Sequence, residues 1–248
     1  MSRLVSIGDV TSRVETWDPL GSMSNEPFHY IDISSVDRES KQVSATQLIL
    51  PCDAPSRARQ IVKAGDILVS TVRPNLNAVA EIPERLDGAT ASTGYCVLRT
   101  DKARIDSRYL YFWVRSSGFI KEMVKRATGA SYPAVSDKIV KDSTLPLPPL
   151  PEQKRIAAIL DKADSIRRKR QETVRLTEEL LRSAFLEMFG DPVVNPKGWD
   201  ICRLGDVVQE IESGWSPVCE EGQPEENEWG VLKLGAVTTC RYLDSNSL

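Results

Sequence analysis

The 248-residue sequence has few of the residues that build most catalytic and metal sites. It contains one histidine, His29, so a catalytic triad or a histidine-rich metal site would depend on that side chain alone. Its five cysteines are odd in number and form no CxxC pair, which argues against a disulfide framework or a zinc ribbon and favours a reducing compartment. We interpret His29 as a structural residue and the cysteines as ordinary thiols, and we expect no metal site.

Long hydrophobic runs are also lacking. No apolar run reaches the roughly 18–20 residues that a membrane span needs. Met1–Val10 lacks the basic and apolar regions of a signal peptide. The sequence therefore predicts a cytoplasmic protein with no membrane partner.

An overall excess of positive charge is missing too, because the net charge is −3. The charge is unevenly distributed. Residues 190–248 carry four basic and eleven acidic residues, which leaves a net charge of +4 on the first 189 residues. Within these, residues 99–141 hold ten Lys or Arg against four Asp or Glu. A modest basic surface is thus available for a nucleic acid, although charged stretches are usually solvated faces.

Residues 1–148 have the pattern of a mixed α/β domain, which places the chain in the α+β class. Short runs rich in β-branched residues and bounded by turn formers predict strands at 29–36, 66–72, 77–82 and 94–99, with irregular polar stretches at 18–26 and 52–59. A helix is expected from Ser107, capped by Asp106 or Ser107 and resuming after Gly118. A loop over 128–133 and a short helix near 136–141 follow.

The character of the sequence changes at Leu145–Pro151, where four prolines in seven residues predict an extended, stiff segment. The 38 residues from Glu152 to Phe189 contain neither Gly nor Pro, and Pro151 suits the first position of a helix. Gly190, followed by Pro192, is typical of a helix stop. We predict one helix, about 57 Å long at 1.5 Å per residue.

The apolar residues of this predicted helix recur at steps of three and four, as in a coiled coil, and a basic segment interrupts them. Such a stripe implies a partner helix; the alternative is that the helix packs on its own domain. The basic segment could contact DNA or acidic groups of a protein partner, and we favour the protein. The expected helix-pairing and subunit-interface residues are Ile156, Leu160, Ala163, Arg167, Arg168, Arg170, Val174, Leu181, Ala184 and Met188.

After this helix the sequence begins to repeat itself. Leu4–Val10 is similar to Ile201–Val207, Trp17 corresponds to Trp215, and Tyr30–Val36 matches Val231–Val237 in hydrophobic pattern. The paired segments are about two hundred residues apart, so the repeating unit is a domain plus a helix. We expect the C-terminal segment to be the start of a second domain.

The junction Leu147–Ile156 (LPPLPEQKRI) resembles the boundary between a target-recognition domain and the conserved helix in specificity subunits of type I restriction-modification systems. Lys63–Ser70 (KAGDILVS) resembles the strand-entry motif of those recognition domains, and Arg203–Val207, after Pro196–Trp199, resembles the opening of a second one. The resemblance implies target-recognition domain 1 over 1–148, a spacer helix over 149–190, and a second recognition domain from 191 that is truncated at 248.

What the resemblance implies is a non-catalytic subunit. Two recognition domains each read half of a split DNA site. Two long helices pair as a ruler and dock DNA adenine methyltransferase subunits, and the assembly can recruit a restriction subunit. The sequence has no GxxxxGK[ST] phosphate loop and no Asn-Pro-Pro-aromatic motif, so we expect no cofactor and no activity of its own. With half of a full member missing, a homodimer through the long helix is one option. A stand-alone DNA-binding regulator or a coiled-coil adaptor is the alternative function.

Residues for double-stranded DNA are expected on loops that flank the predicted strands. Arginine can bind guanine with two hydrogen bonds, and asparagine can do the same with adenine. Small and polar loop residues can approach a phosphate. The expected DNA-binding residues are Arg57, Arg59, Lys63, Arg73, Asn75, Asn77, Lys125, Arg126, Gly129, Ser131 and Tyr132.

Overall fold

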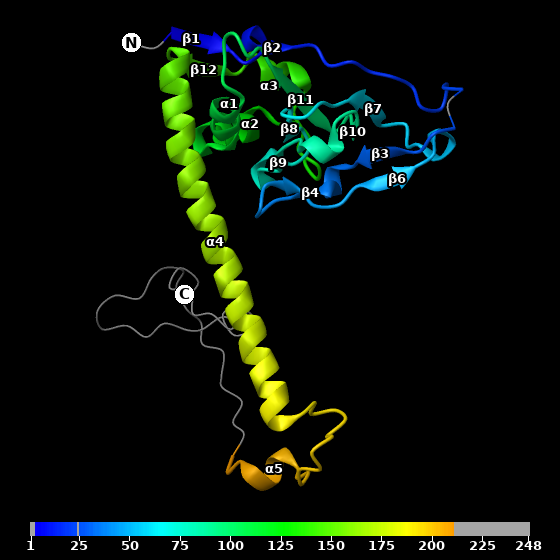
Figure 1. Ribbon diagram of the computed structural model, residues 1–248, viewed down its shortest axis with the longest axis vertical. Coiled ribbons are helices and arrows are strands. Elements are labelled where there is room, and N and C mark those ends of the chain that lie inside the picture. Colours follow the sequence, from blue (N-terminus) through cyan, green and yellow to red (C-terminus); the bar gives the residue numbers. More distant parts are fainter. Residues whose placement is uncertain (1–2, 24, 211–248) are drawn as a thin grey trace. The chain divides into compact units, whose positions relative to one another are not determined.

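A computed structural model describes residues 3–23 and 25–210 of the chain (Figure 1). The chain divides into two compact units, Met1–Arg182 and Ser183–Leu248. The expected α+β class is confirmed. The strands are β1 (Arg3–Ser6), β2 (Thr11–Ser12), β3 (Phe28–Ile31), β4 (Val36–Asp37), β5 (Gln42–Val43), β6 (Gln47–Ile49), β7 (Ala58–Ile61), β8 (Ile67–Ser70), β9 (Val79–Glu81), β10 (Thr90–Ser92), β11 (Tyr95–Thr100) and β12 (Thr144–Leu147). The helices are α1 (Ser107–Arg115), α2 (Ser117–Arg126), α3 (Asp137–Asp142), α4 (Leu150–Phe189) and α5 (Leu204–Val207).

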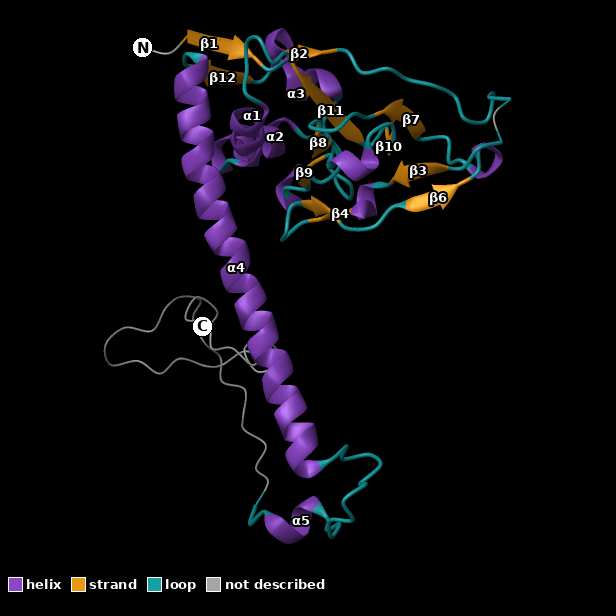
Figure 2. Cartoon of the chain, in the orientation of Figure 1, coloured by secondary structure: helices purple, strands orange, loops and turns teal. Residues whose placement is uncertain are grey.

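Two four-stranded sheets form the body of the first unit, with strand orders β2-β11-β8-β9 and β6-β3-β10-β7 (Figure 2). β8 is buried on both of its faces. Ile67 and Val69 pack with residues of α1 and α2, whereas Leu68 packs with Ile31 and other residues of the second sheet. Because side chains alternate along a strand, β8 joins a helical layer on one side to a second sheet on the other. This accounts for its uninterrupted apolar sequence.

Each of the four segments predicted to be strands overlaps a strand of the structure. The helical segment predicted from Ser107 also forms, but it is interrupted at a different residue than predicted. Asp106 caps α1, because its carboxylate accepts a hydrogen bond from the Tyr109 backbone N–H at 3.0 Å. The chain then leaves helical geometry at Ser116, whose hydroxyl accepts from the Phe119 N–H at 3.3 Å and caps α2. The break falls at a capping serine and not at Gly118, because a side-chain acceptor for free N–H groups specifies a helix start more strongly than a glycine does.

The first residues of the proline-rich segment, predicted to be extended, lie in the strand β12. β12 pairs antiparallel with β1, and Pro146 lies opposite Leu4. The strand that begins the domain therefore lies beside the strand that leads directly into α4. Proline is tolerated there because an edge strand needs only part of its backbone donors.

α4 is one helix of 40 residues, two residues longer at its start than the sequence predicted. Its first half packs on the domain through buried polar groups. Gln153 is 1% exposed, and its side chain accepts from the Asp106 N–H at 2.8 Å and donates to the Pro148 and Arg104 carbonyls. Further along, the Asp164 carboxylate lies 3.2 Å from Arg115 of α1, and Arg108 of α1 is paired with Asp161.

This contact changes the interpretation of the apolar stripe. Ile156 packs against the core of its own domain, and its neighbour Ala157 is 4% exposed. From Lys169 to Thr177 every side chain is exposed, and so are Leu181 and Met188. The expected continuous pairing face is therefore divided: Ile156 at its start packs on the chain's own domain, whereas Leu160, Ala163 and the stripe residues of the second half are mostly exposed in the described residues.

The residues that follow α4 donate hydrogen bonds to the last carbonyl groups of the helix. The last four carbonyls of a helix have no partner within it. Here the Gly190 N–H donates to Leu186, the Lys197 ammonium donates to Glu187 and Met188, and the Trp199 indole N–H donates to Phe189 at 2.8 Å. Gly190 adopts a φ of +80°, as the expected stop requires. The helix end is thus specified by residues 190–199.

The described part of the repeat has a shared local structure. In the first copy the Asp9 carboxylate accepts from the Ser6 N–H, and in the second the Asp206 carboxylate accepts from the Arg203 N–H. Both carboxylates close a short turn three residues after the donor. Trp215 and residues 231–237, the other paired segments, lie outside the described residues. Among those described, no helix is both long and apolar enough to cross a membrane.

Candidate nucleic-acid interface

Two segments that are distant in sequence meet at one surface of the first unit. The loop Thr128–Pro133 is closed by a pair of hydrogen bonds between Thr128 and Ala134, each 2.9 Å. The Arg73 N–H donates to the Pro133 carbonyl at 2.7 Å, which ties the loop to the turn after β8. As a result the Arg73 guanidinium lies over the Tyr132 ring, with Cζ 4.5 Å from the ring centroid.

The backbone of both segments is unusual at the points of contact. Arg73 has a φ of +49°, a left-handed conformation uncommon outside glycine. Gly129 has a φ of +101°, and a Cβ there would lie 2.9 Å from the Tyr132 carbonyl oxygen. Strained residues of this kind persist where the surrounding structure holds them, and they gather at functional sites.

A small cavity of about 150 Å³ adjoins Arg73 and Tyr132 and is also lined by Arg38. Tyr132 is 68% exposed, and Arg38, Arg73 and Asn75 are exposed as well. We call this surface the Arg73–Tyr132 patch, and it consists of Arg38, Arg73, Asn75, Gly129, Ser131 and Tyr132. No ion pair of the described residues involves its two arginines. Their guanidinium groups are therefore available to an acceptor from outside.

Arg57 is connected to the chain segment before Arg73 through backbone hydrogen bonds. Its carbonyl accepts from the Thr93 N–H at 2.8 Å, and the next residue, Gly94, accepts from Thr71, two residues before Arg73. The side chain of Arg57 is exposed. It is therefore a further candidate for contact with a ligand at the patch.

Other residues expected to bind DNA are engaged within the chain. Arg59 is 2.7 Å from Asp18, and this arginine holds the pKa of that carboxyl below its usual value. Lys63 lies 3.8 Å from Glu15, and Arg126 lies 2.9 Å from Glu122 of its own helix. Such exposed pairs are weak, so the three cations stay accessible at little cost. Lys125 is exposed and has no ion pair among the described residues.

Asn77 differs from the sequence-based expectation. Its side-chain N–H donates to the Arg115 carbonyl at 3.1 Å, and its Oδ1 is buried without a hydrogen-bond partner in the described structure. The amide thus faces the protein interior, where it joins the turn after β8 to α1. We therefore leave Asn77 out of the patch and assign it a positioning role.

Arg38 is the patch residue that the sequence did not single out. It lies in the hairpin turn between β4 and β5. The sequence offers only a polar turn there, with nothing to indicate that the turn meets residues 73 and 132. The basic segment of α4 also differs from expectation: Arg167 and Arg168 are 2.9 Å and 3.3 Å from Asp164 of the same helix, and Arg167 donates to the Glu39 carbonyl.

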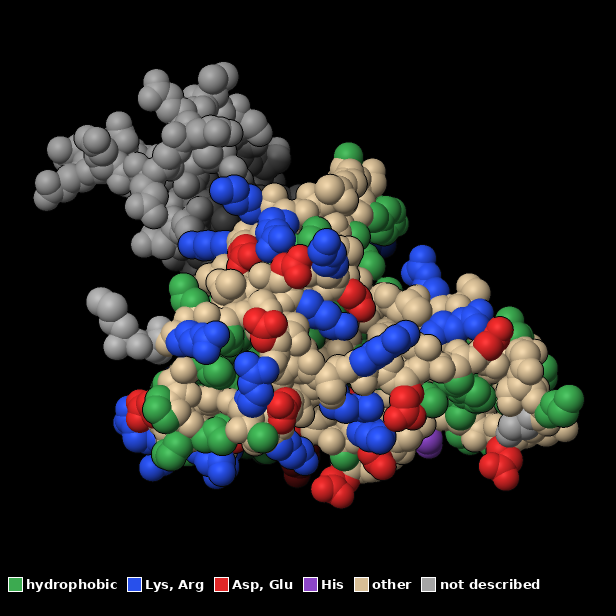
Figure 3. Space-filling model, turned by 90° about the horizontal axis from the view of Figure 1, so that it is seen from above, with side chains coloured by type: hydrophobic (Ala, Val, Ile, Leu, Met, Phe, Trp, Pro, Cys, Tyr) green, Lys and Arg blue, Asp and Glu red, His purple; other side chains and the backbone are tan. Residues whose placement is uncertain are grey.

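The electrostatic character of the domain surface is mixed. Figure 3 shows Lys and Arg side chains interspersed with Asp and Glu on the face it presents, without one continuous basic area. The described residues hold no group of three or more His, Cys, Asp or Glu side chains that could bind a metal ion.

Comparison with known proteins defines the class of this domain. Residues 57–177 match the family model described as Type I restriction modification DNA specificity domain. That segment contains Arg57, the Arg73–Asn77 turn, the Thr128–Pro133 loop and most of α4.

The curated relatives and the solved structures agree with that class. The chain is 34% identical over 91 residues to the type I restriction enzyme EcoEI specificity subunit of Escherichia coli, covering 34% of this chain and 15% of the relative. It is 24% identical over 203 residues to the MjaIX specificity subunit of Methanocaldococcus jannaschii, covering 75% and 43%. The crystal structure of the HsdS subunit from Thermoanaerobacter tengcongensis is 36% identical, with a TM-score of 0.60, covering 80% of this chain and 51% of that one.

A second solved chain, from a study of complex assembly and conformational transition of the type I R-M system, is 34% identical with a TM-score of 0.64 and covers 90% of this chain and 59% of that one. The chain is therefore similar over most of its length to specificity subunits of type I restriction-modification systems, and residues 57–177 match the DNA specificity domain of that class. It spans about half the length of the solved relatives and less than half of the curated ones. The expectation of a non-catalytic specificity subunit agrees with the names of these relatives.

Proposed function

We propose that this chain recognises DNA sequence for a type I restriction-modification complex, with its first unit reading one half of a split target. The observation that carries the proposal is the Arg73–Tyr132 patch, where two loops present arginine, asparagine and an aromatic ring from a rigid sheet. Arginine and asparagine can read base edges, and the ring holds the arginine side chain in a defined direction. Binding sites are commonly built on loops that a rigid scaffold positions.

In this proposal phosphate contacts set the position of the DNA and base contacts set the choice of sequence. The exposed cations Arg57 and Lys125 lie outside the tip of the patch and suit phosphates. Arg73 and Asn75 suit base edges. Arg38, Gly129 and Ser131 line the remaining approach.

The second half of α4 is the proposed docking surface for DNA adenine methyltransferase subunits and for a paired helix. Its exposed apolar residues include Val174, Leu181 and Met188, and these three are each more than half exposed in the described structure. The paired helix belongs to a second domain of the same protein or to a second copy of the chain. A restriction subunit would then join the assembly through the methyltransferase.

The proposal is tested by expressing the chain with a methyltransferase subunit and mapping methylated adenines across the genome of the host. We expect methylation at one recurrent motif that becomes degenerate at one base pair in an Arg73→Ala variant. Stable DNA binding without a co-purifying methyltransferase would instead make the chain a stand-alone regulator. Absence of any salt-dependent DNA binding would leave only the adaptor role.

A further inference from the structure

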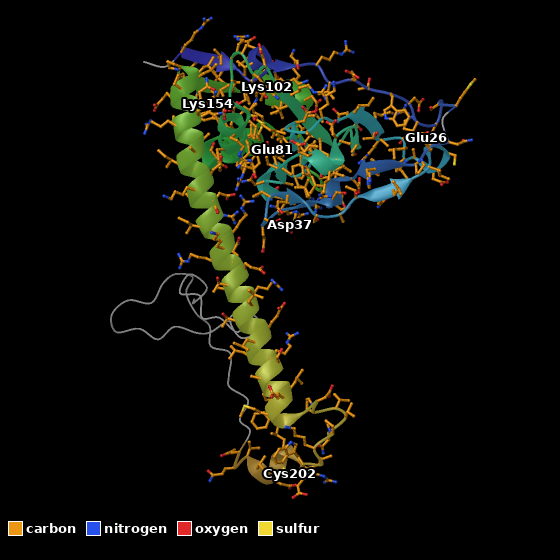
Figure 4. The ribbon with its side chains drawn as sticks, viewed as in Figure 1. Glu26, Asp37, Glu81, Lys102, Lys154 and Cys202 are labelled. Atoms are coloured by element: carbon orange, nitrogen blue, oxygen red, sulfur yellow. The ribbon has the colours of Figure 1, made fainter. Side chains whose placement is uncertain are left out.

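A cleft of about 540 Å³ lies in the first unit, between the β4–β5 hairpin, the end of β9, α1 and α4. Its charged lining residues are five basic and two acidic: Lys41, Arg85, Lys102, Arg108 and Arg168 against Glu81 and Glu84. We call it the junction cleft. Figure 4 labels Glu81 and Lys102, two residues of its lining. The cleft is distinct from the Arg73–Tyr132 patch, and the two share no lining residue.

Some of the basic side chains that line the cleft have ion-pair partners, and others have none. Arg108 is paired with both Glu81 and Asp161, and Arg168 lies 3.3 Å from Asp164. Arg85 has only a backbone partner, the Val43 carbonyl at 2.9 Å. Within the described residues, Lys41, Arg85 and Lys102 form no ion pair, so no carboxylate directly neutralises their positive charges.

Lys41 is the least solvated of these cations. Its ammonium donates to the Asn77 carbonyl, and its backbone is held at a φ of +58° in the hairpin turn. Burial, together with the nearby Arg115 and Arg167, lowers the pKa of Lys41 to about 8, and Asp37 and Asp164 offset this only in part. A half-buried lysine beside two arginines produces a positive potential that an anion would relieve.

The lining also includes surface that suits a ligand with an organic part. Tyr111 is 4% exposed and Ile82 is 1% exposed, and both belong to the wall of the cleft. A volume of this size lies in the range of small-ligand sites, which combine apolar walls with a few convergent charges. Uncompensated cations of the Lys and Arg type are the usual partners of phosphate groups.

We infer that the junction cleft binds phosphate groups. Two sources offer the same chemistry: the backbone of a DNA duplex lying along the hairpin and α4, and a free phosphorylated ligand. The first source rests on the proposed function, whereas the second does not. The contact between Lys41 and Asn77 connects the cleft to the turn that carries Arg73 and Asn75, the proposed base-reading residues.

The test compares the wild-type chain with a Lys41→Met/Lys102→Met variant and a Lys154→Met control. Lys154 is exposed on α4, has no ion pair in the described residues and does not line the cleft. It lies 14 residues before Arg168, about 21 Å along the helix. Thermal melting of all variants checks that they are folded. A single Lys102→Met variant, in an exposed position, replaces the double variant if Lys41→Met does not fold.

The first measurement is calorimetric titration with inorganic pyrophosphate. We expect the wild type and the control to bind it, and the double variant to bind it about tenfold more weakly or not at all. The second measurement is the salt dependence of binding to a 20-base-pair duplex. Each lost phosphate contact lowers the slope of log K against log salt by about 0.9, so we expect the double variant to lose about 1 to 2 units of slope.

A change in the pyrophosphate measurement alone assigns the cleft to free phosphorylated ligands, and a change in slope assigns it to the DNA backbone. Either result supports the inference. If the double variant matches the control in both measurements, the cleft is not a phosphate site, even when wild-type DNA binding upholds the proposed function. If the wild type binds no DNA, the proposed function fails, and the pyrophosphate titration still decides the inference.

Discussion

The side-chain oxygen of Gln153 accepts a hydrogen bond at 2.8 Å from the backbone N–H of Asp106, the residue that caps α1. The same side chain donates to two carbonyls, so a single buried amide joins the first turn of α4 to the start of α1 and to the end of the proline-rich segment. The glutamine of the junction sequence LPPLPEQKRI thus has a structural role that its position in a helix does not reveal.

We predict that Gln153→Ala lowers the free energy of unfolding by about 3 kcal/mol, because each of its three partly buried hydrogen bonds contributes about 1 kcal/mol. Chemical denaturation measures this change. Lys154→Ala, at the exposed next residue, is the matched control, with an expected change within about 0.5 kcal/mol. Equal effects of the two substitutions would contradict the role of Gln153.

Two glycines give a paired test of the patch. Gly129→Ala forces a Cβ against the Tyr132 carbonyl at a φ of +101°, so we expect a loss of about 1–3 kcal/mol in stability and weaker DNA binding. Gly118→Ala places a Cβ in open space within α2, and a stability gain of about 0.5–1 kcal/mol is expected. Thermal melting and a binding titration distinguish them. A harmless Gly129→Ala would show that the loop does not hold Tyr132 in place.

Base reading and phosphate contact predict different consequences for two substitutions. Arg73→Ala removes the guanidinium over Tyr132 and is expected to relax sequence choice, with about 1–3 kcal/mol less discrimination at one base pair. Lys125→Ala is expected to weaken binding evenly across sequences. Selection of bound sequences from a random duplex pool measures both. If Arg73→Ala leaves the selected motif unchanged, the patch does not read bases.

The free face of α4 is tested by Leu181→Glu, which places a charge on a residue that is 66% exposed in the described structure. We expect a loss of helix pairing, seen as a lower mass by light scattering or as loss of a co-purifying methyltransferase subunit. Lys169→Gln, at an exposed position of the same helix, is the control and should leave both unchanged. Unaltered assembly of Leu181→Glu would mean that this face is not the docking surface.

The lowered pKa of Lys41 has a consequence for stability. Between about pH 8 and pH 9.5 the folded lysine has released a proton that the unfolded one still binds, so this group makes the folded state more stable as pH rises. The groups that face Lys41 are Arg115, Arg167, Asp37 and Asp164, and none of these titrates in that range. The unfolding free energy of the wild type, minus that of Lys41→Met, should rise across it. A flat difference would show that the lysine is solvated.

Much of the fold follows from local sequence. The absence of Gly and Pro over Glu152–Phe189 specifies α4, and Gly190 specifies its stop. The apolar run Ile67–Ser70 specifies a fully buried strand. Capping side chains at Asp106 and Ser116 specify the helix starts. These features depend on backbone geometry, side-chain periodicity and hydrogen bonds between near neighbours, and all of those are encoded within a few residues.

The site depends on contacts that no local pattern contains. Whether an arginine or asparagine faces solvent is decided by packing: Arg73 points outward over Tyr132, whereas Asn77, four residues later, turns inward to Arg115. Packing also decides which residues of the apolar stripe on α4 are exposed. Ile156 packs against the core of the domain, and Asp164 pairs with Arg115 of α1. The sequence by itself determined a mixed α+β domain, a long helix and a resemblance to the type I specificity subunits. Only the tertiary structure decided which charges are paired and which remain available, since a charge finds its partner through space and not along the chain.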